Sequence, residues 1–466
     1  MGGAKAKTGT APRLMFWLLV SLVLLAPLAL GAVYPWSWGL LASFVGVLLL
    51  AWGARTIASK QPPAVGAARL WPVLVLFAIA AAWAGLQMGA MTPGAWNHPL
   101  WKDAALALGA DLDRHVTVNP YATGSALLRL LSYGGVFWLA LQYCRQGHRA
   151  KQVFYALTVA GLAYAAYGLA VEFTGAQKIL WFDKTSYLDN LTSTFVNRNS
   201  YATYAGLGLL CATGLLVRLV SEIHGSHDTR RERFRLILAA FVDHGWVLIV
   251  AWVVIATALL LTESRAGVLS VWLGLLTLFL AAAASRTMPF RHVAAVAAGA
   301  IAGGVAFFAL SGGTVLDRLA RTSTEEGLRP QVYELTLESI SDAPWLGTGY
   351  GTFADVFRMY RDESVPSIVE RAHNTYLENA LELGWPAAAA LFLAVAVCVL
   401  YCALGVRRRR RDAIYPAVGV AASVLVAAHS LVDFSLQIPA VAVTYSLLLG
   451  AACAQSWSTR PASPGP

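Results

Sequence analysis

Twelve apolar runs constrain the fold of this chain more than any other sequence feature. Each run is about 18 to 25 residues long, which is the length that an α-helix needs to cross the hydrocarbon core of a bilayer. The composition agrees, since 58% of the 466 residues are hydrophobic and only 13% are charged. We therefore predict an all-α, polytopic membrane protein with about twelve transmembrane helices. The predicted spans are approximately 14–33, 36–53, 70–88, 125–143, 152–173, 200–220, 245–262, 265–284, 291–311, 385–404, 413–431 and 438–456.

The distribution of basic residues predicts the orientation of these spans. If the N-terminus is cytoplasmic, that side of the membrane carries 22 of the 35 basic residues and 5 of the 25 acidic residues. The run of five arginines at 407–411 belongs to the same side. This asymmetry follows the positive-inside rule. The formal net charge of +10 thus indicates topology and contact with the anionic lipid bilayer, not with nucleic acid.

The first span and the cysteines add two negative predictions. The first apolar run is too long for a typical signal peptide and lacks a clear cleavage site, so we interpret it as an uncleaved helix. All five cysteines lie in or at the ends of predicted spans, so no disulfide framework is expected. We also predict no metal site, because the outer loops lack a His, Asp and Glu spacing typical of one.

Three outer segments are long enough to hold catalytic or binding residues: 89–124, 174–199 and 312–384. The last of these is predicted to hold a helix over about 329–341, a turn at DAPWLGTGYG, and a second helix at TFADVFRMYRD. The chain thus divides into nine spans (1–311), a large helical periplasmic loop (312–384), and three spans with a short cytoplasmic tail (385–466).

Several polar residues are predicted at the outer ends of the spans. They are Arg198 in TFVNRNSY, Arg265 in the short connector LTESRAG, Arg329 at the start of the first loop helix, His373 with Asn374 and Tyr376 in RAHNTYLENALELGWP, and His429 with Asp433 in HSLVDF. His429 and Asp433 are four residues apart, which predicts one helical face. Arginines beside a histidine at the hydrocarbon boundary suit a substrate with a phosphorylated head and a lipid tail. We interpret Glu378, Arg358, Arg361 and Arg371 as solvated or structural residues outside this group.

The order of three motifs carries a family resemblance. SRAG after an apolar span, an arginine-led helix followed by PWLGTGYGTF, and HNTYLENALELGWPAA before the next span resemble the O-antigen ligase and polymerase superfamily of bacterial membrane glycan transferases. The resemblance is strongest over about 195–440. Twelve spans, with one large loop between the ninth and the tenth, also match that family.

The resemblance implies glycan transfer from an undecaprenyl diphosphate donor to an acceptor hydroxyl. The reaction would take place at the periplasmic face of a bacterial inner membrane and need no metal, nucleotide or other cofactor. Arg265 and Arg329 match the arginines that hold the donor diphosphate in such relatives, and His373 matches the histidine that acts on the acceptor. Arg198, Asn374, Tyr376, His429 and Asp433 are secondary candidates.

The chemistry of these residue types is consistent with that assignment. A guanidinium stays protonated and can contact phosphate oxygens in a bidentate manner, and preorganised cations stabilise charge that develops on a leaving group. A histidine titrates near neutral pH and can accept the proton of the acceptor hydroxyl.

Several functions stay open on the sequence alone. The acceptor could be a glycan or lipid A-core, so a ligase, a polymerase of O-antigen or exopolysaccharide repeats, and a protein-glycosylating relative are not distinguished. A flippase or transporter of lipid-linked glycans belongs to another class and would place charges along a cavity near the bilayer midplane. The predicted spans are almost free of charge, which favours an enzyme that works at one surface.

Overall fold

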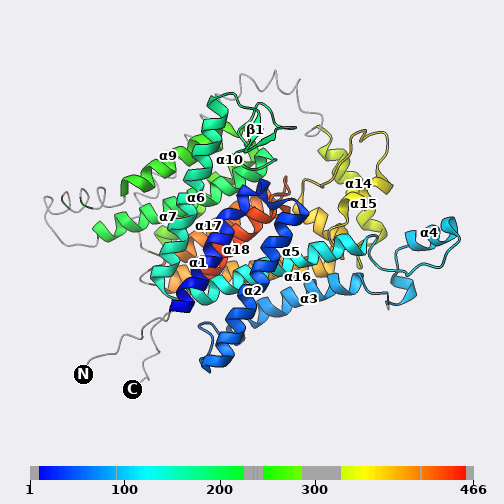
Figure 1. Cartoon of the computed structure of the whole chain (residues 1–466), viewed down its shortest axis with the longest axis horizontal. Coiled ribbons are helices and arrows are strands. Elements are labelled where there is room, and N and C mark those ends of the chain that lie inside the picture. Colours follow the sequence, from blue (N-terminus) through cyan, green and yellow to red (C-terminus); the bar gives the residue numbers. More distant parts are fainter. Residues whose placement is uncertain are drawn as a thin grey trace.

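The computed structural model describes residues 10–90, 92–224, 245–285, 327–409 and 412–457, together with Arg235 and Ala239. The described part is a bundle of α-helices with one small hairpin (Figure 1). Its α-helices are α1 (Thr10–Leu25), α2 (Pro35–Ser59), α3 (Trp71–Gln87), α4 (Leu100–Leu108), α5 (Pro120–Tyr143), α6 (Gly147–Phe173), α7 (Arg198–His224), α9 (Trp246–Leu261), α10 (Arg265–Ala284), α14 (Arg329–Asp342), α15 (Phe353–Tyr360), α16 (Thr375–Arg408), α17 (Ile414–His429) and α18 (Pro439–Ala454). The 3-10 helices are η1 (Ala26–Leu28), η2 (Leu30–Ala32), η3 (Ala67–Arg69), η4 (Gly94–Trp96) and η6 (Ser435–Gln437). The antiparallel hairpin pairs β1 (Lys178–Ile179) with β2 (Phe182–Asp183).

The described helices confirm the prediction of a helical protein, and many have the length and apolar composition of membrane-spanning helices. Six described helices are long and apolar enough to cross a bilayer, and five shorter apolar helices accompany them. These eleven helices fall at eleven of the twelve predicted spans. The remaining predicted span, 291–311, lies outside the described residues, so the count of twelve stays a prediction.

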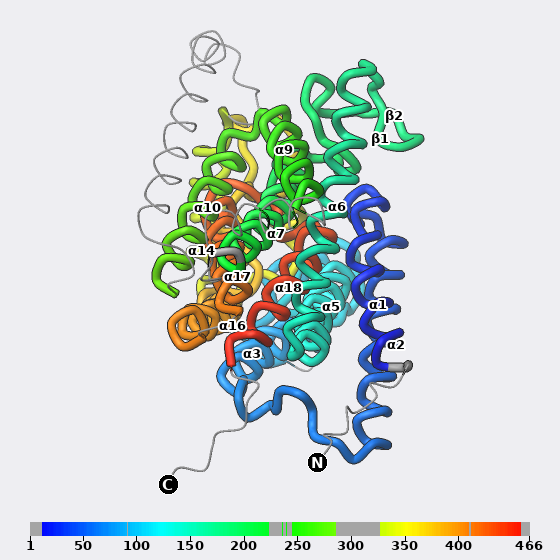
Figure 2. Tube along the Cα trace, turned by 90° about the vertical axis from the view of Figure 1, so that its left-hand side faces the viewer, coloured from blue at the N-terminus to red at the C-terminus, as the bar shows by residue number. Residues whose placement is uncertain are grey.

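The centre of the bundle is α18, which packs against α5, α7, α16 and α17 (Figures 1 and 2). Every residue of α18 except Ser446 is buried, as expected for a helix that is apolar on all sides. At the periphery, α2 exposes Leu40, Phe44, Val47 and Leu50. Exposed apolar side chains on a long helix suit contact with lipid chains.

The described part of the predicted outer loop confirms its two helices and the turn between them. Helices α14 and α15 flank the turn and pack on α16. Gly347 has a φ of 68°, and an added Cβ there would lie 2.4 Å from the carbonyl oxygen of Glu382. The turn thus approaches α16 closely because position 347 has no side chain. Residues 312–326 of the loop lie outside the described residues.

The β1–β2 hairpin, α4 and the α14–α15 pair lie along the upper and right-hand edge of the bundle in Figure 1. These elements belong to the three segments predicted to face outward, and their common edge agrees with one shared surface. Which compartment this surface faces stays a prediction from the charge distribution.

We predict that a cysteine at Glu363 is labelled from the periplasm by a membrane-impermeant maleimide in intact cells. Glu363 is exposed between α15 and α16, and the five native cysteines are all buried, so background labelling should be low. Ser59→Cys, at the exposed end of α2, is the matched control and should react only after the inner membrane is permeabilised. The reverse pattern would overturn the predicted orientation.

Candidate functional site

His373 lies directly before α16 with an unusual backbone. Its φ is 52°, in the left-handed region that residues other than glycine rarely adopt. Asn374 is the N-cap of α16, and its side chain accepts hydrogen bonds from the backbone N–H groups of Tyr376 and Leu377 at 3.0 and 3.1 Å. The Tyr376 hydroxyl donates to a backbone carbonyl at the end of α17. Asn374 and Tyr376 thus fix the start of α16 beside His373.

The α16 helix begins about ten residues before the predicted span at 385. Its first turns are polar, so hydropathy alone places them in the preceding loop, 312–384. The Asn374 cap starts the helix at Thr375, and Gly384, with a φ of 73°, lies at a kink where these turns meet the apolar part. The charged residues of these turns are therefore held on a helix.

Arg329 opens α14 as predicted and is tied to His373 through Tyr333. The Tyr333 hydroxyl, one turn along the helix, donates to the backbone carbonyl of His373 at 3.0 Å. Arg329 lies within electrostatic range of both Tyr333 and His429. Its Nε is buried and has no hydrogen-bond partner among the described residues.

Arg265, which the sequence places in the short connector between two spans, is the first residue of α10. Ser264 caps this helix, accepting from Gly267 N–H, and its hydroxyl donates to the Asn199 side chain at 2.7 Å. The guanidinium of Arg265 is exposed, and no described side chain forms an ion pair with it. Arg198, beside Asn199, donates to Asn190 at 3.0 Å.

The prediction that His429 and Asp433 share one helical face is wrong. Helix α17 ends at His429, so Asp433 lies in the turn beyond it. Each residue instead bonds to α7: His429 Nδ1 lies 2.6 Å from the Thr203 hydroxyl, and Asn199 donates to Asp433 at 3.2 Å. Both side chains are almost fully buried, at 1% exposure.

Contacts through these residues or their immediate neighbours thus link the predicted site residues into one region. The Thr375 hydroxyl donates to the backbone carbonyl of Asp433 at 3.0 Å, and the His373 ring packs edge-on against Phe434 at 4.9 Å between centroids. We call this region the outer polar cluster. Its members are Arg198, Asn199, Ser264, Arg265, Arg329, Tyr333, His373, Asn374, Tyr376, His429 and Asp433.

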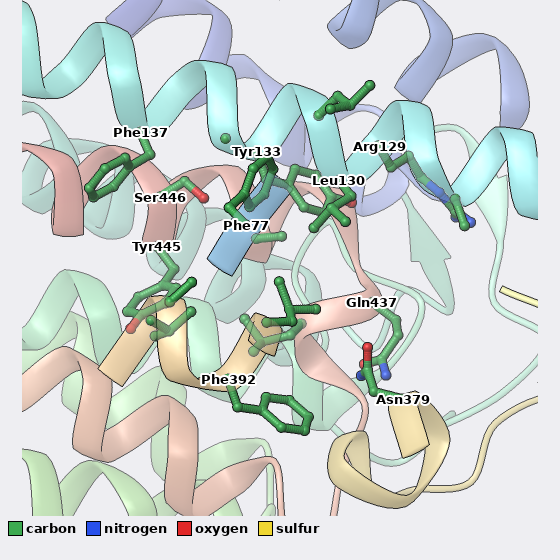
Figure 3. A pocket seen from close by; sticks show the side chains of 18 of the residues that line it. Phe77, Arg129, Leu130, Tyr133, Phe137, Asn379, Phe392, Gln437, Tyr445 and Ser446 are labelled. Carbon is green, nitrogen blue, oxygen red and sulfur yellow. The ribbon is translucent and has the colours of Figure 1, made fainter. Parts of the chain in front are cut away.

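A groove of about 510 Å³ lies next to the outer polar cluster, between α3, α5, α16 and α18. Most of its lining is apolar, and Figure 3 shows Phe137 and Tyr445 at one end and Arg129, Asn379 and Gln437 at the other. The Gln437 side chain accepts from the Thr375 hydroxyl at 3.3 Å. The polar end of the groove is therefore continuous with the outer polar cluster.

Three further charged residues line this groove: Arg371 and Glu378, which the sequence interpretation left aside, and Glu382, which it did not consider. Glu378 is 1% exposed, so it is not a solvated residue. It forms an ion pair with Arg371 at 3.0 Å. Burial acts to lower the pKa of Arg371, but the carboxylates of Glu378 and Glu382 outweigh it and raise that pKa.

Arg129 is a further charged residue that the sequence interpretation missed. It lies in α5, inside the predicted span 125–143, with its guanidinium over the ring of Trp38. A charged residue inside a membrane span is by itself an indication of function. This rule would have selected Arg129 from the sequence. Within the described ranges, no three His, Cys, Asp or Glu side chains gather as a metal-binding group.

This architecture is that of a multi-pass membrane protein with a histidine- and arginine-containing polar site at one end of its helices. Residues 249–392 match the family model described as O-antigen ligase, and this match supports the resemblance to the O-antigen ligase superfamily. The match includes Arg265, Arg329 and His373 and is narrower than the 195–440 resemblance seen in the sequence. No curated protein matches the chain. The family match supports a glycan-transfer role in surface polysaccharide biosynthesis and implies a lipid-linked glycan substrate.

Proposed function

We propose that this protein transfers a glycan from undecaprenyl diphosphate to an acceptor hydroxyl at the periplasmic face of the inner membrane. The observation that supports the proposal is the series of contacts that links the starts of α10, α14 and α16, where Arg265, Arg329 and His373 lie. Neither guanidinium has an ion-pair partner among the described side chains. Two guanidinium groups suit a dianionic ligand, because each can form charge-assisted hydrogen bonds to phosphate oxygens.

The reaction follows from these roles. The acceptor oxygen attacks the anomeric carbon of the donor sugar, and the bond from that carbon to the diphosphate oxygen breaks. His373 takes the proton of the acceptor hydroxyl, and undecaprenyl diphosphate leaves with the bonding electrons. Arg265 and Arg329 stabilise the charge that develops on this leaving group.

The groove supports the lipid part of the proposal. Its apolar lining suits an isoprenoid or acyl chain, and its polar end adjoins Thr375, two residues after His373. A lipid chain seated there would leave its head group beside the outer polar cluster. We propose that the groove holds the chain of a lipid-linked substrate.

Within this reaction type, the acceptor decides between a ligase and a polymerase. We favour an O-antigen ligase, because the matching family model carries that description. A deletion strain should then lose attachment of its surface polysaccharide and accumulate lipid-linked polymer, measured by gel profile and lipid extraction. Accumulation of single lipid-linked repeats would instead assign a polymerase. An unchanged glycan profile, in a strain without a second such gene, would contradict glycan transfer altogether.

A further inference from the structure

The backbone of His373 is held from both sides. On the C-terminal side, the Asn374 cap and the bond from Thr375 N–H to the Ser430 carbonyl fix the start of α16. On the N-terminal side, Ala372 N–H donates to Glu378 Oε2 at 3.0 Å. His373 lies between these anchors in a left-handed conformation. A conformation of this kind persists only where the surroundings impose it.

One buried carboxylate forms this N-terminal anchor, and the Tyr333 hydroxyl adds a hydrogen bond to the His373 carbonyl. Glu378 Oε1 accepts from Arg371 Nη1 at 3.0 Å, while Oε2 accepts from Ala372 N–H. Both oxygens are thus used on the two residues that precede His373. A buried carboxylate needs a cationic partner, and the Arg371 guanidinium supplies it. Glu378 itself is one turn inside α16, so it ties the loop onto the helix that follows it.

We infer that Glu378 is a positioning residue, which acts through Arg371 and Ala372 to hold the His373 imidazole toward the reacting groups. The inference deepens the proposed function and rests on the role proposed there for His373. Without the carboxylate, Ala372 N–H loses its partner and residue 373 can relax to an ordinary extended conformation. The imidazole then leaves its place beside Phe434, whereas Arg265 and Arg329 stay in place because other helices carry them.

Glu378→Gln and Glu378→Asp test this inference. The amide in the first variant cannot accept from both partners in the same way, and the shorter carboxylate in the second keeps the charge beside Arg371 but reaches less far. We expect turnover to fall about 10²-fold, the size of effect that a misplacement of about 1 Å produces. Donor binding should stay within about twofold of the wild type, because the residues that bind the diphosphate are unchanged. Glu370→Gln, an exposed carboxylate in the same segment, is the matched control and should behave as the wild type.

A chemical readout separates this inference from the proposed function. Diethyl pyrocarbonate modifies accessible imidazoles, and peptide mass spectrometry gives the rate at His373 relative to His98 in the same molecule. We expect this relative rate to change at least threefold in both Glu378 variants and to stay constant in Glu370→Gln. An unchanged rate in Glu378→Asp, with the melting temperature near that of the wild type, would overturn the positioning role even if turnover falls.

The two hypotheses fail in different ways. If His373→Ala retains full turnover, the proposed catalytic role is wrong, while the labelling rates still report whether Glu378 holds the imidazole. Combining Glu378→Gln with His373→Ala completes the test. A residue that acts only through His373 adds no further loss in that background, and independent effects would multiply. A multiplicative loss of turnover would therefore contradict the inference.

Discussion

His373→Ala should lower glycan transfer by about 10² to 10⁴-fold, the contribution typical of a general base. Donor binding should survive, because His373 reaches the site from the start of α16 while the proposed diphosphate contacts come from α10 and α14. The measurement uses purified protein in nanodiscs, with retention of undecaprenyl diphosphate-linked glycan and formation of product assayed separately.

His98→Ala is the matched control for this experiment. His98 lies in the outer segment before α4, and its Nδ1 accepts a hydrogen bond from the backbone N–H of Leu100. We expect this variant to keep wild-type turnover. Equal loss of donor binding in His373→Ala and Arg329→Ala would place His373 in the donor site. Unimpaired turnover in His373→Ala would leave it with only a structural role.

Arg265→Lys and Arg329→Lys should each weaken donor retention and transfer by about 10- to 100-fold although both variants keep the positive charge. A lysine ammonium cannot reproduce the planar guanidinium contact to a diphosphate, and hydrogen bonds to charged groups contribute roughly 1.5 to 3 kcal/mol. Thermal stability should stay near that of the wild type, because Arg265 is exposed and Arg329 forms no ion pair with a described side chain. Retention of radiolabelled donor and thermal melting measure the two effects.

Arg358→Lys is the control for this pair of variants, since Arg358 is an exposed arginine on α15 in the same outer segment. It should bind donor as the wild type does. Full donor retention in both Arg265→Lys and Arg329→Lys would remove the proposed diphosphate role. A loss of melting temperature that parallels the loss of binding would assign the arginines to the fold instead.

Hydropathy and helix signals predicted much of this fold. Eleven described helices fall at predicted spans, and Arg329 opens a helix as expected. These features are local: a span is set by the length of its apolar run, and a helix start by its cap or by a proline in the first turn. The turn at PWLGTGYGTF was also predicted from the sequence, because glycines adopt backbone conformations that other residues avoid.

The features that needed the structure are those set by distant partners. Glu378 and Arg371 were interpreted as solvated or structural, because sequence alone does not show that they pair in a buried place. The start of α16 was misplaced for a related reason, since its polar turns are held by contacts with the turn before α15 and with α17. The groove likewise depends on four helices that are far apart in the chain.

The most direct test of the central claim is the reaction of the purified wild-type protein in proteoliposomes. The donor is undecaprenyl diphosphate-linked glycan, and lipid A-core and lipid-linked repeat units are supplied as acceptors. Glycosylated acceptor and released undecaprenyl diphosphate are quantified together. Glycan transfer by this protein predicts that they appear in equal amounts and that both are lost in His373→Ala. Movement of intact donor across the bilayer, with no new glycosidic bond in any acceptor, would contradict transfer and assign the protein to the flippases.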